Sequence, residues 1–270
     1  MPQPTRVLSV TSGKGGVGKT AVVANTACCL ARSGKKVLLL DADLGLANID
    51  VVFGLTPQFN LNHFFSGEKD LRSIIVRGPH DLHILPAGSG QQSFILLDGD
   101  QKLRLLDGLG TLDDDYDFVF IDTEAGISEN VTYFNTAAHD IVLVTTPDPT
   151  AITDAYALMK LLSTQYHEKK FCLVVNMVRD ETEALDVYRK LTVVANRYLD
   201  ISIDYYGSIP YDRQMAEAIR RQQAIVDLHA DAHVSLAFTE LAEHIAKCNW
   251  ERSPKGNVQF FWNQLLRSDS

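Results

Sequence analysis

The feature of the sequence that most constrains the fold is a glycine-rich segment near the beginning of the chain. It consists of Gly13, Lys14, Gly15, Gly16, Val17, Gly18, Lys19 and Thr20. The segment matches the phosphate-loop pattern G-x-x-x-x-G-K-[ST], and it joins an apolar run, Arg6–Val10, to an amphipathic run, Lys19–Ser33. Glycines let a backbone wrap closely round phosphate groups, and the first turn of a helix offers free N–H groups. We therefore expect a strand, a phosphate-binding loop and a helix, and we count Ala21, in the first helical turn, with the binding residues.

Short apolar runs alternate with longer amphipathic runs along the rest of the chain. The expected strands are Arg6–Val10, Lys36–Asp41, Leu82–Leu85, Phe118–Asp122, Ile141–Thr145, Phe171–Asn176 and Tyr205–Ile209. The expected helices are Lys19–Ser33, Gln101–Leu112, Thr150–Tyr166, Thr182–Arg197, Asp212–Gln222 and Ala232–Lys247. Most of the strands lack polar alternation, which is typical of strands buried on both faces. The pattern predicts an α/β fold in which a mostly parallel sheet is covered by helices on both faces.

Three carboxylates follow apolar strands at the end where open α/β sheets bind their ligands. Asp41 ends one expected strand and Asp43 lies just beyond it, and Asp122 ends another. Magnesium prefers oxygen ligands, and phosphoryl transfer to water needs an oriented water molecule. We expect Lys19 to neutralise the β- and γ-phosphates and the Thr20 hydroxyl to bind Mg²⁺.

Charge and cysteine content exclude several classes of protein. The chain of 270 residues has 25 Lys and Arg against 34 Asp and Glu, and its net charge of −9 disfavours a generally basic nucleic-acid binder. None of the four cysteines has C-x-x-C spacing, so the sequence suggests no zinc or iron–sulfur site. The N-terminal residues lack the pattern of a signal peptide, and no apolar run is long enough to span a bilayer. We expect a cytoplasmic protein with no specific nucleic-acid partner.

The C-terminal segment differs from the rest of the chain. We expect residues 1–248 to form one domain, residues 249–257 to form a linker, and residues 258–270 to form an amphipathic helix. The apolar face of that helix would contain Phe261, Trp262, Leu265 and Leu266. Such a helix either lies in the interface of an anionic membrane or docks on its own domain. Two copies in a dimer would bind a membrane more firmly than one, through avidity.

The loop sequence KGGVGKT resembles the deviant Walker A motif of the MinD/ParA family of P-loop ATPases. The resemblance implies a homodimer that encloses two ATP molecules, in which Lys14 reaches the nucleotide of the partner subunit. It also implies that Asp43 positions the attacking water and that Asp41 supports the metal or its waters. Asp122 takes the Walker B position and would hold Mg²⁺ through a water molecule.

The same resemblance implies a set of contacts to the nucleotide base. The positions of Asn176 and Pro210 contact adenine in the family, and Arg179 is a further candidate for stacking on the base. Taken alone, Asn and Pro are common turn residues at strand ends. Their combination with the phosphate loop makes ATP the expected nucleotide, with Mg²⁺ as the expected metal.

Further motifs resemble the FlhG/FleN branch of the family, whose members set the number and placement of bacterial flagella. They are LDADLGLANIDVVFGL, LNHFFSGEKDL, ILPAGSG, DTEAGIS, VVNMV, GSIPYD and the tail FFWNQLLRS. The resemblance implies a regulatory ATPase that moves reversibly between the cytosol and the inner face of the cytoplasmic membrane. It also implies partners such as an FlhF-like GTPase, a flagellar transcription activator or C-ring proteins.

Three other functions stay open at this point. They are a ParA-type ATPase that partitions DNA or another cargo, an iron–sulfur carrier or reductase of the same fold, and a nucleotide-bound scaffold without hydrolysis. The scaffold is considered because Glu124 stands in the DTEAGIS motif where the branch usually has a small residue. A carboxylate near the γ-phosphate repels it unless the side chain is directed away.

Overall fold

The computed structural model describes residues 5–46, 48–88, 96–112 and 115–248. The strands are β1 (Arg6–Ser12), β2 (Val37–Ala42), β3 (Val76–Arg77), β4 (His83–Leu85), β5 (Phe118–Ala125), β6 (Asp140–Thr145), β7 (Lys170–Val178) and β8 (Ser202–Pro210). The α-helices are α1 (Lys19–Arg32), α2 (Ile49–Val52), α3 (Leu61–Phe65), α4 (Gly99–Gly110), α5 (Glu129–Ala137), α6 (Pro149–Tyr166), α7 (Glu181–Tyr198), α8 (Gln214–Arg221), α9 (Ile225–Leu228) and α10 (His233–Lys247). Two short 3-10 helices are η1 (Arg72–Ile74) and η2 (Pro79–Asp81). In these ranges no helix is long and apolar enough to cross a membrane.

The strands form one eight-stranded sheet in the order β3-β4-β2-β5-β1-β6-β7-β8. Every neighbouring pair is parallel except β3 with β4 at one edge. β1 lies at the centre, with β5 on one side and β6 on the other, so the loop that follows β1 emerges from the middle of the sheet. That position places the phosphate loop where the strands' carboxyl ends meet, the usual ligand edge of such sheets.

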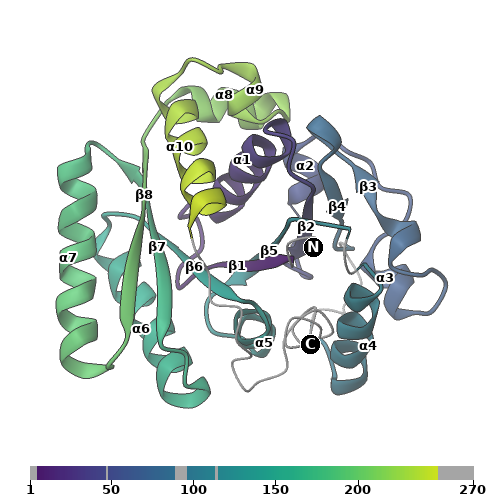
Figure 1. The fold of residues 1–270 in the computed structure, drawn as a ribbon, viewed down its shortest axis with the longest axis horizontal. Coiled ribbons are helices and arrows are strands. Elements are labelled where there is room, and N and C mark those ends of the chain that lie inside the picture. The colour runs from purple at the N-terminus through teal and green to yellow at the C-terminus, as the bar shows by residue number, and fades with distance from the viewer. Residues whose placement is uncertain (1–4, 47, 89–95, 113–114, 249–270) are drawn as a thin grey trace.

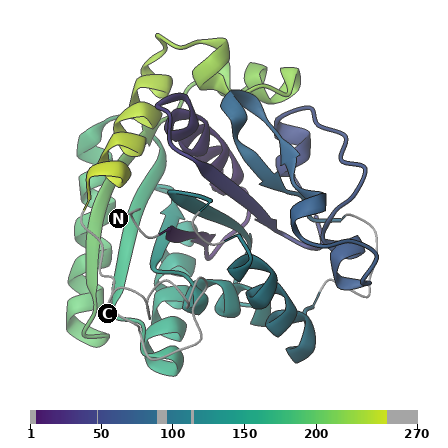
Figure 2. The ribbon, with the colours of Figure 1, turned by 45° about the vertical axis from the view of Figure 1, so that its right-hand side comes forward.

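Helices cover both faces of the sheet (Figures 1 and 2). On one face, α1, α9 and α10 pack on alternate strand residues such as Leu8, Val142 and Val174. On the other face, α4 and α5 pack on one part of the sheet and α6 and α7 on another, against residues such as Val119 and Leu143. Because both faces are covered, strand residues of either parity are apolar, which explains why the sequence shows little alternation.

A buried charge cluster joins the two ends of this domain. Arg6, at the start of β1, donates from Nε to Asp140 Oδ2 at 2.7 Å and from a terminal nitrogen to the Tyr206 hydroxyl at 3.0 Å. Its other terminal nitrogen donates to the carbonyl of Ile245, in the last turn of α10, at 2.7 Å. The Arg6 and Asp140 side chains are only 2% and 9% exposed. The cluster therefore fixes α10 to the first strand.

The structure confirms the predicted architecture and adds elements that the sequence analysis does not contain. Every expected strand and helix is present, with ends that move by a few residues. The analysis omits β3, a two-residue antiparallel edge strand, as well as α5 and the short helices α2, α3, α9, η1 and η2. Helix α5 lacks a clear apolar pattern because some of its buried positions are polar, such as Asn135, whose Oδ1 accepts from the Ser9 hydroxyl. Ser128 caps α5 by accepting from the Val131 N–H, and this cap followed by an acidic residue is a signal that could have located the helix.

Candidate functional site

The phosphate loop connects β1 to α1 in the conformation that its glycines require. Gly18 has a φ of 81°, in the left-handed region that favours glycine, and a Cβ there would overlap the Asn176 side-chain amide. A Cβ on Gly13 would overlap the backbone carbonyl of Asp154 in α6. The loop is thus held between α6 and the end of β7, with its N–H groups at the N-terminus of α1.

A cavity of about 350 Å³ opens beside this loop. Its lining includes the predicted binding residues Gly15, Gly16, Val17, Gly18, Lys19, Thr20 and Ala21, together with Asp43. Met215, Ile219, Gln223 and Ile225 complete the wall from α8 and α9, and Asn48 contributes from the start of α2. The sequence analysis missed these wall residues because only the packing of α8 and α9 beside α1 brings them to the loop.

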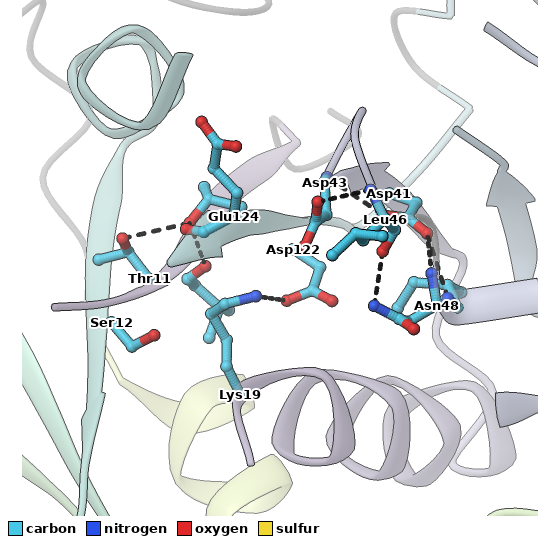
Figure 3. Close-up of polar contacts among 12 residues, drawn as sticks. Thr11, Ser12, Lys19, Asp41, Asp43, Leu46, Asn48, Asp122 and Glu124 are labelled. Atoms are coloured by element: carbon cyan, nitrogen blue, oxygen red, sulfur yellow. Dashed lines mark hydrogen bonds and ion pairs between the residues drawn. The ribbon is translucent and has the colours of Figure 1, made fainter. Parts of the chain in front are cut away.

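Lys19 and Asp122 form a buried ion pair below the cavity (Figure 3). The Lys19 Nζ lies 2.6 Å from Asp122 Oδ1, and the two side chains are 8% and 2% exposed. A buried cation of this kind needs an anionic partner. In this state the carboxylate supplies the negative charge, and a bound phosphate would compete with it for the ammonium group.

Asp41 holds the loop that precedes α2. Its carboxylate accepts from the backbone N–H groups of Asp43 at 3.2 Å, Asn48 at 3.0 Å and Ile49 at 3.1 Å. Burial, and to a lesser degree the nearby charge of Asp122, raise the pKa of Asp41 to about 7. With both oxygens on backbone donors, Asp41 organises the loop, and its predicted support of the metal stays a prediction.

Asp43 is the carboxylate of this loop that reaches the cavity. Its Oδ1 accepts from the Leu46 N–H at 3.0 Å (Figure 3). Partial burial raises the pKa of Asp43, an effect opposed by the Leu46 hydrogen bond and by the charge of Lys19. The loop thus fixes a carboxylate at the edge of the cavity, and its predicted positioning of the attacking water stays a prediction.

Glu124 follows Asp122 on β5, and its carboxylate is directed away from the Lys19–Asp122 pair (Figure 3). It accepts a hydrogen bond from the Ser128 hydroxyl, at the N-terminus of α5. Farther along the loop, the Gly126 N–H donates to the Ser12 carbonyl at 2.9 Å, which ties this segment to the phosphate loop. The repulsion that a carboxylate at this position could exert on a γ-phosphate is therefore reduced by its direction.

Lys14 lies on a different side of the loop from Lys19. Its ammonium group donates to the Thr150 hydroxyl and lies 3.5 Å from Asp148 Oδ2, and its side chain is 38% exposed. Lys14 lines a second, shallow cavity of about 400 Å³ that also contains Asp148 and Arg179. The two lysines of one loop therefore face different cavities.

The three predicted adenine contacts are placed differently from one another. Asn176 is 6% exposed, and its side-chain amide donates to the Val17 carbonyl at 2.8 Å, so it braces the phosphate loop. Arg179 is bound to Glu183, four residues later, with a nitrogen–oxygen distance of 2.8 Å and a side chain 82% exposed. Pro210 ends β8 beside Val178 of β7. Contact of these residues with a base stays a prediction.

The site has the donors that Mg²⁺ prefers. Thr20, which carries a hydroxyl, lines the cavity. Asp122 contacts Lys19 through Oδ1 at 2.6 Å, and its second carboxylate oxygen is not part of that contact. Hydroxyl and carboxylate oxygens, completed by phosphate oxygens and water, are the usual ligands of this ion. The residues therefore fit a nucleotide-bound magnesium.

Comparison with known proteins agrees with this geometry. The ParA protein family, described as NUBPL iron-transfer P-loop NTPase, matches residues 3–246. The chain belongs to this family. It is 40% identical to the antiactivator FleN of Pseudomonas aeruginosa, over 98% of this chain and 94% of that protein. It is 34% identical to the flagellum site-determining protein YlxH of Helicobacter pylori, over 97% and 90% of the two chains.

Solved structures of the family have the same fold. The septum site-determining protein MinD of Pyrococcus horikoshii, complexed with Mg-ADP, has a TM-score of 0.75 and 27% identity, and the match covers 90% of this chain and 96% of that one. MinD in the MinC:MinD complex of Aquifex aeolicus also has a TM-score of 0.75, with 25% identity and coverage of 93% and 99%. The protein is thus an ATP-binding P-loop ATPase of the MinD/ParA family, and its relatives place it in the FlhG/FleN branch.

The predicted membrane-binding residues Phe261, Trp262, Leu265 and Leu266 lie outside the described residues, as does the predicted linker 249–257. Their roles stay predictions. The described domain ends at Cys248, just after α10.

Proposed function

We propose that the protein is a slow, Mg²⁺-dependent ATPase that forms a homodimer on ATP and controls the number or placement of flagella. The observation that carries the proposal is the division of roles between two lysines of one loop. Lys19 is buried against Asp122, whereas Lys14 stands on the outer side, bound to Thr150 and Asp148. A lysine with surface contacts is available to the nucleotide of a second copy, so dimerisation would depend on ATP.

Flagellar control is proposed from the relatives, which are named an antiactivator and a flagellum site-determining protein. The chain matches nearly their whole length. The name antiactivator fits a flagellar transcription activator as the partner. The resemblance to the FlhG/FleN branch implies an FlhF-like GTPase or a C-ring protein as further candidates. Reversible binding to the cytoplasmic membrane through residues 258–270 completes the proposal, since two tails on one dimer bind more firmly than one.

Hydrolysis would use the residues around the cavity. Lys19 would neutralise the β- and γ-phosphates, Thr20 and Asp122 would hold the magnesium, and Asp43 would orient the attacking water. Magnesium, when bound, withdraws charge from the phosphates. We expect turnover well below the roughly 10 s⁻¹ of a typical enzyme because the action of a switch depends on the lifetime of its ATP state.

The oligomeric state with Mg-ATP and with Mg-ADP tests the proposal, measured by size exclusion with light scattering. The parent is expected to dimerise only with ATP, and Lys14→Gln is expected to stay monomeric while it still binds the nucleotide. Lys35→Gln, at an exposed lysine outside the cavity, serves as the matched control. A parent that stays monomeric with Mg-ATP would contradict the proposal.

Liposome co-sedimentation tests the membrane part with the same protein. Full-length chain should sediment with anionic vesicles in ATP, and a chain that ends at Asn257 should not. Salt-sensitive binding to random duplex DNA that requires ATP, without sedimentation, would instead favour a DNA-partitioning ATPase. In cells, replacing the protein by Lys19→Ala should change the number of flagella per cell.

A further inference from the structure

Three potential metal ligands from distant parts of the sequence meet behind the nucleotide cavity. Cys28 lies in α1, His80 in η2 and Asp227 in α9. Their ligating atoms all lie within 4.8 Å of one another. The His80 Nε2 is 2.8 Å from Asp227 Oδ1, and the Cys28 Sγ is 3.8 Å from Asp227 Oδ2. The sequence analysis missed this cluster because it searched for closely spaced cysteines.

The distances are close to those of a tetrahedral zinc site. Typical zinc–ligand distances of 2.0–2.3 Å place neighbouring ligand atoms roughly 3.4–3.6 Å apart. The Cys28–Asp227 separation of 3.8 Å differs little from that spacing. The His80 Nε2 and Asp227 Oδ1 atoms are 2.8 Å apart and form a direct hydrogen bond. A metal ion would replace this hydrogen bond, and the two atoms would move apart to bind it. The Cys28 and His80 ligand atoms lie within 4.8 Å of each other, so forming the site takes side-chain movements of up to roughly 1 Å.

The donor set and the surrounding charge favour zinc over magnesium or calcium. One sulfur, one imidazole nitrogen and one carboxylate suit a borderline-soft cation, whereas hard cations prefer oxygen ligands alone. A thiolate and a carboxylate carry two negative charges, which balance the ion. The Arg32 guanidinium, 3.9 Å from Asp227 Oδ1, is a positive charge beside the site, and Zn²⁺ would replace it as the partner of that carboxylate.

Solvent reaches the cluster on one side only. The Cys28 side chain belongs to the core, with no exposed surface, while the His80 and Asp227 side chains are 35% and 30% exposed. An ion can therefore enter past the imidazole and the carboxylate and meet the thiol at the inner end. This arrangement leaves the outer, fourth position to a water molecule.

We propose that Cys28, His80 and Asp227 form a zinc-binding site with water as the fourth ligand. The Cys28 thiol would lose its proton to solvent, and His80 would bind through Nε2. The site would join α9 to α1, the helix that begins at Lys19 of the phosphate loop. Ile225, two residues before Asp227, lines the nucleotide cavity, so the bound ion would fix one wall of that cavity.

The test uses the full-length, nucleotide-free protein with Zn²⁺ and with Co²⁺ as a spectroscopic probe. We expect one high-affinity ion per chain by calorimetry, and a thiolate-to-cobalt charge-transfer band that Zn²⁺ removes. Cys28→Ala and His80→Asn are each expected to weaken Zn²⁺ binding at least about tenfold. Loss of a residue that only hydrogen-bonds a metal ligand already costs about tenfold, and loss of a ligand itself should cost more.

The matched control is Cys29→Ala, which removes a neighbouring buried thiol outside the cluster. Cys29→Ala should leave the charge-transfer band unchanged. In the absence of metal, Cys28→Ala should unfold on heating much as the parent does, so that a lost band reflects a lost ligand and not a lost fold. A parent without the band would overturn the proposal. So would a band that survives in Cys28→Ala, or one that Cys29→Ala abolishes.

Discussion

The buried Lys19–Asp122 pair gives a quantitative prediction about the nucleotide-free protein. Replacing Lys19 by Met keeps the length of the side chain but leaves the Asp122 carboxylate, 2% exposed, without its cation. Breaking a buried pair by removing one partner costs about 3–5 kcal/mol. We therefore expect Lys19→Met to lower the free energy of unfolding by about 4 kcal/mol near neutral pH.

A double-mutant cycle separates the pair from other effects of the substitution. Lys19→Met combined with Asp122→Asn removes both charges, so it should be more stable than Lys19→Met alone. The deficit of the single variant should also shrink in acid, because protonation neutralises the unpaired carboxylate. Urea unfolding followed by far-ultraviolet circular dichroism measures each value. A Lys19→Met variant within about 1 kcal/mol of the parent, with the same pH dependence, would refute the reasoning.

Three further predictions concern Asp41, Gly18 and Arg6. The pKa of Asp41 is raised from 3.8 to about 7 in the folded state. Between these two values the folded state retains a proton that the unfolded state loses. The free energy of unfolding should therefore fall by about 4 kcal/mol from about pH 4 to about pH 7. Urea unfolding across that range should show this slope in the parent and not in Asp41→Asn. Gly18→Ala should weaken ATP binding at least about tenfold in a fluorescent-nucleotide titration, because the new Cβ would overlap the Asn176 side chain. Gly34→Ala is the control, since Gly34 has a φ of 86° and open space around it. It measures the free-energy cost of the backbone conformation alone, which is roughly 1–2 kcal/mol. Arg6→Met should lower the free energy of unfolding by about 3–5 kcal/mol, since it leaves the Asp140 carboxylate buried; little loss in urea unfolding would contradict the account of that cluster.

The sequence predicts best the features that local chemistry determines. The phosphate loop could be located because its glycines and lysines are needed at fixed spacing, and the structure places most of them round one cavity. The strands could be located because both faces of the sheet are buried, which makes them continuously apolar. The position of Asp122 in β5, directly after the apolar run 118–121, follows from the same pattern.

Features that depend on tertiary packing could not be predicted. The bracing of Val17 by Asn176 joins residues far apart in the sequence, and only the placement of β7 beside the loop reveals it. The meeting of Cys28, His80 and Asp227 depends on the packing of α1, η2 and α9. No spacing rule connects such positions, so sequence inspection treats the thiol as an ordinary core residue.

The cluster round Arg6 has a consequence for the order in which the protein matures during synthesis. Arg6 is among the first residues made, and its carboxylate partner Asp140 follows at about the middle of the chain. The carbonyl of Ile245 in α10 comes later still, and at about 5–20 residues per second the ribosome needs roughly 5–20 s more to produce it. Until then the buried guanidinium lacks one of its acceptors. The central strand thus reaches its final environment only when nearly the whole domain has been translated.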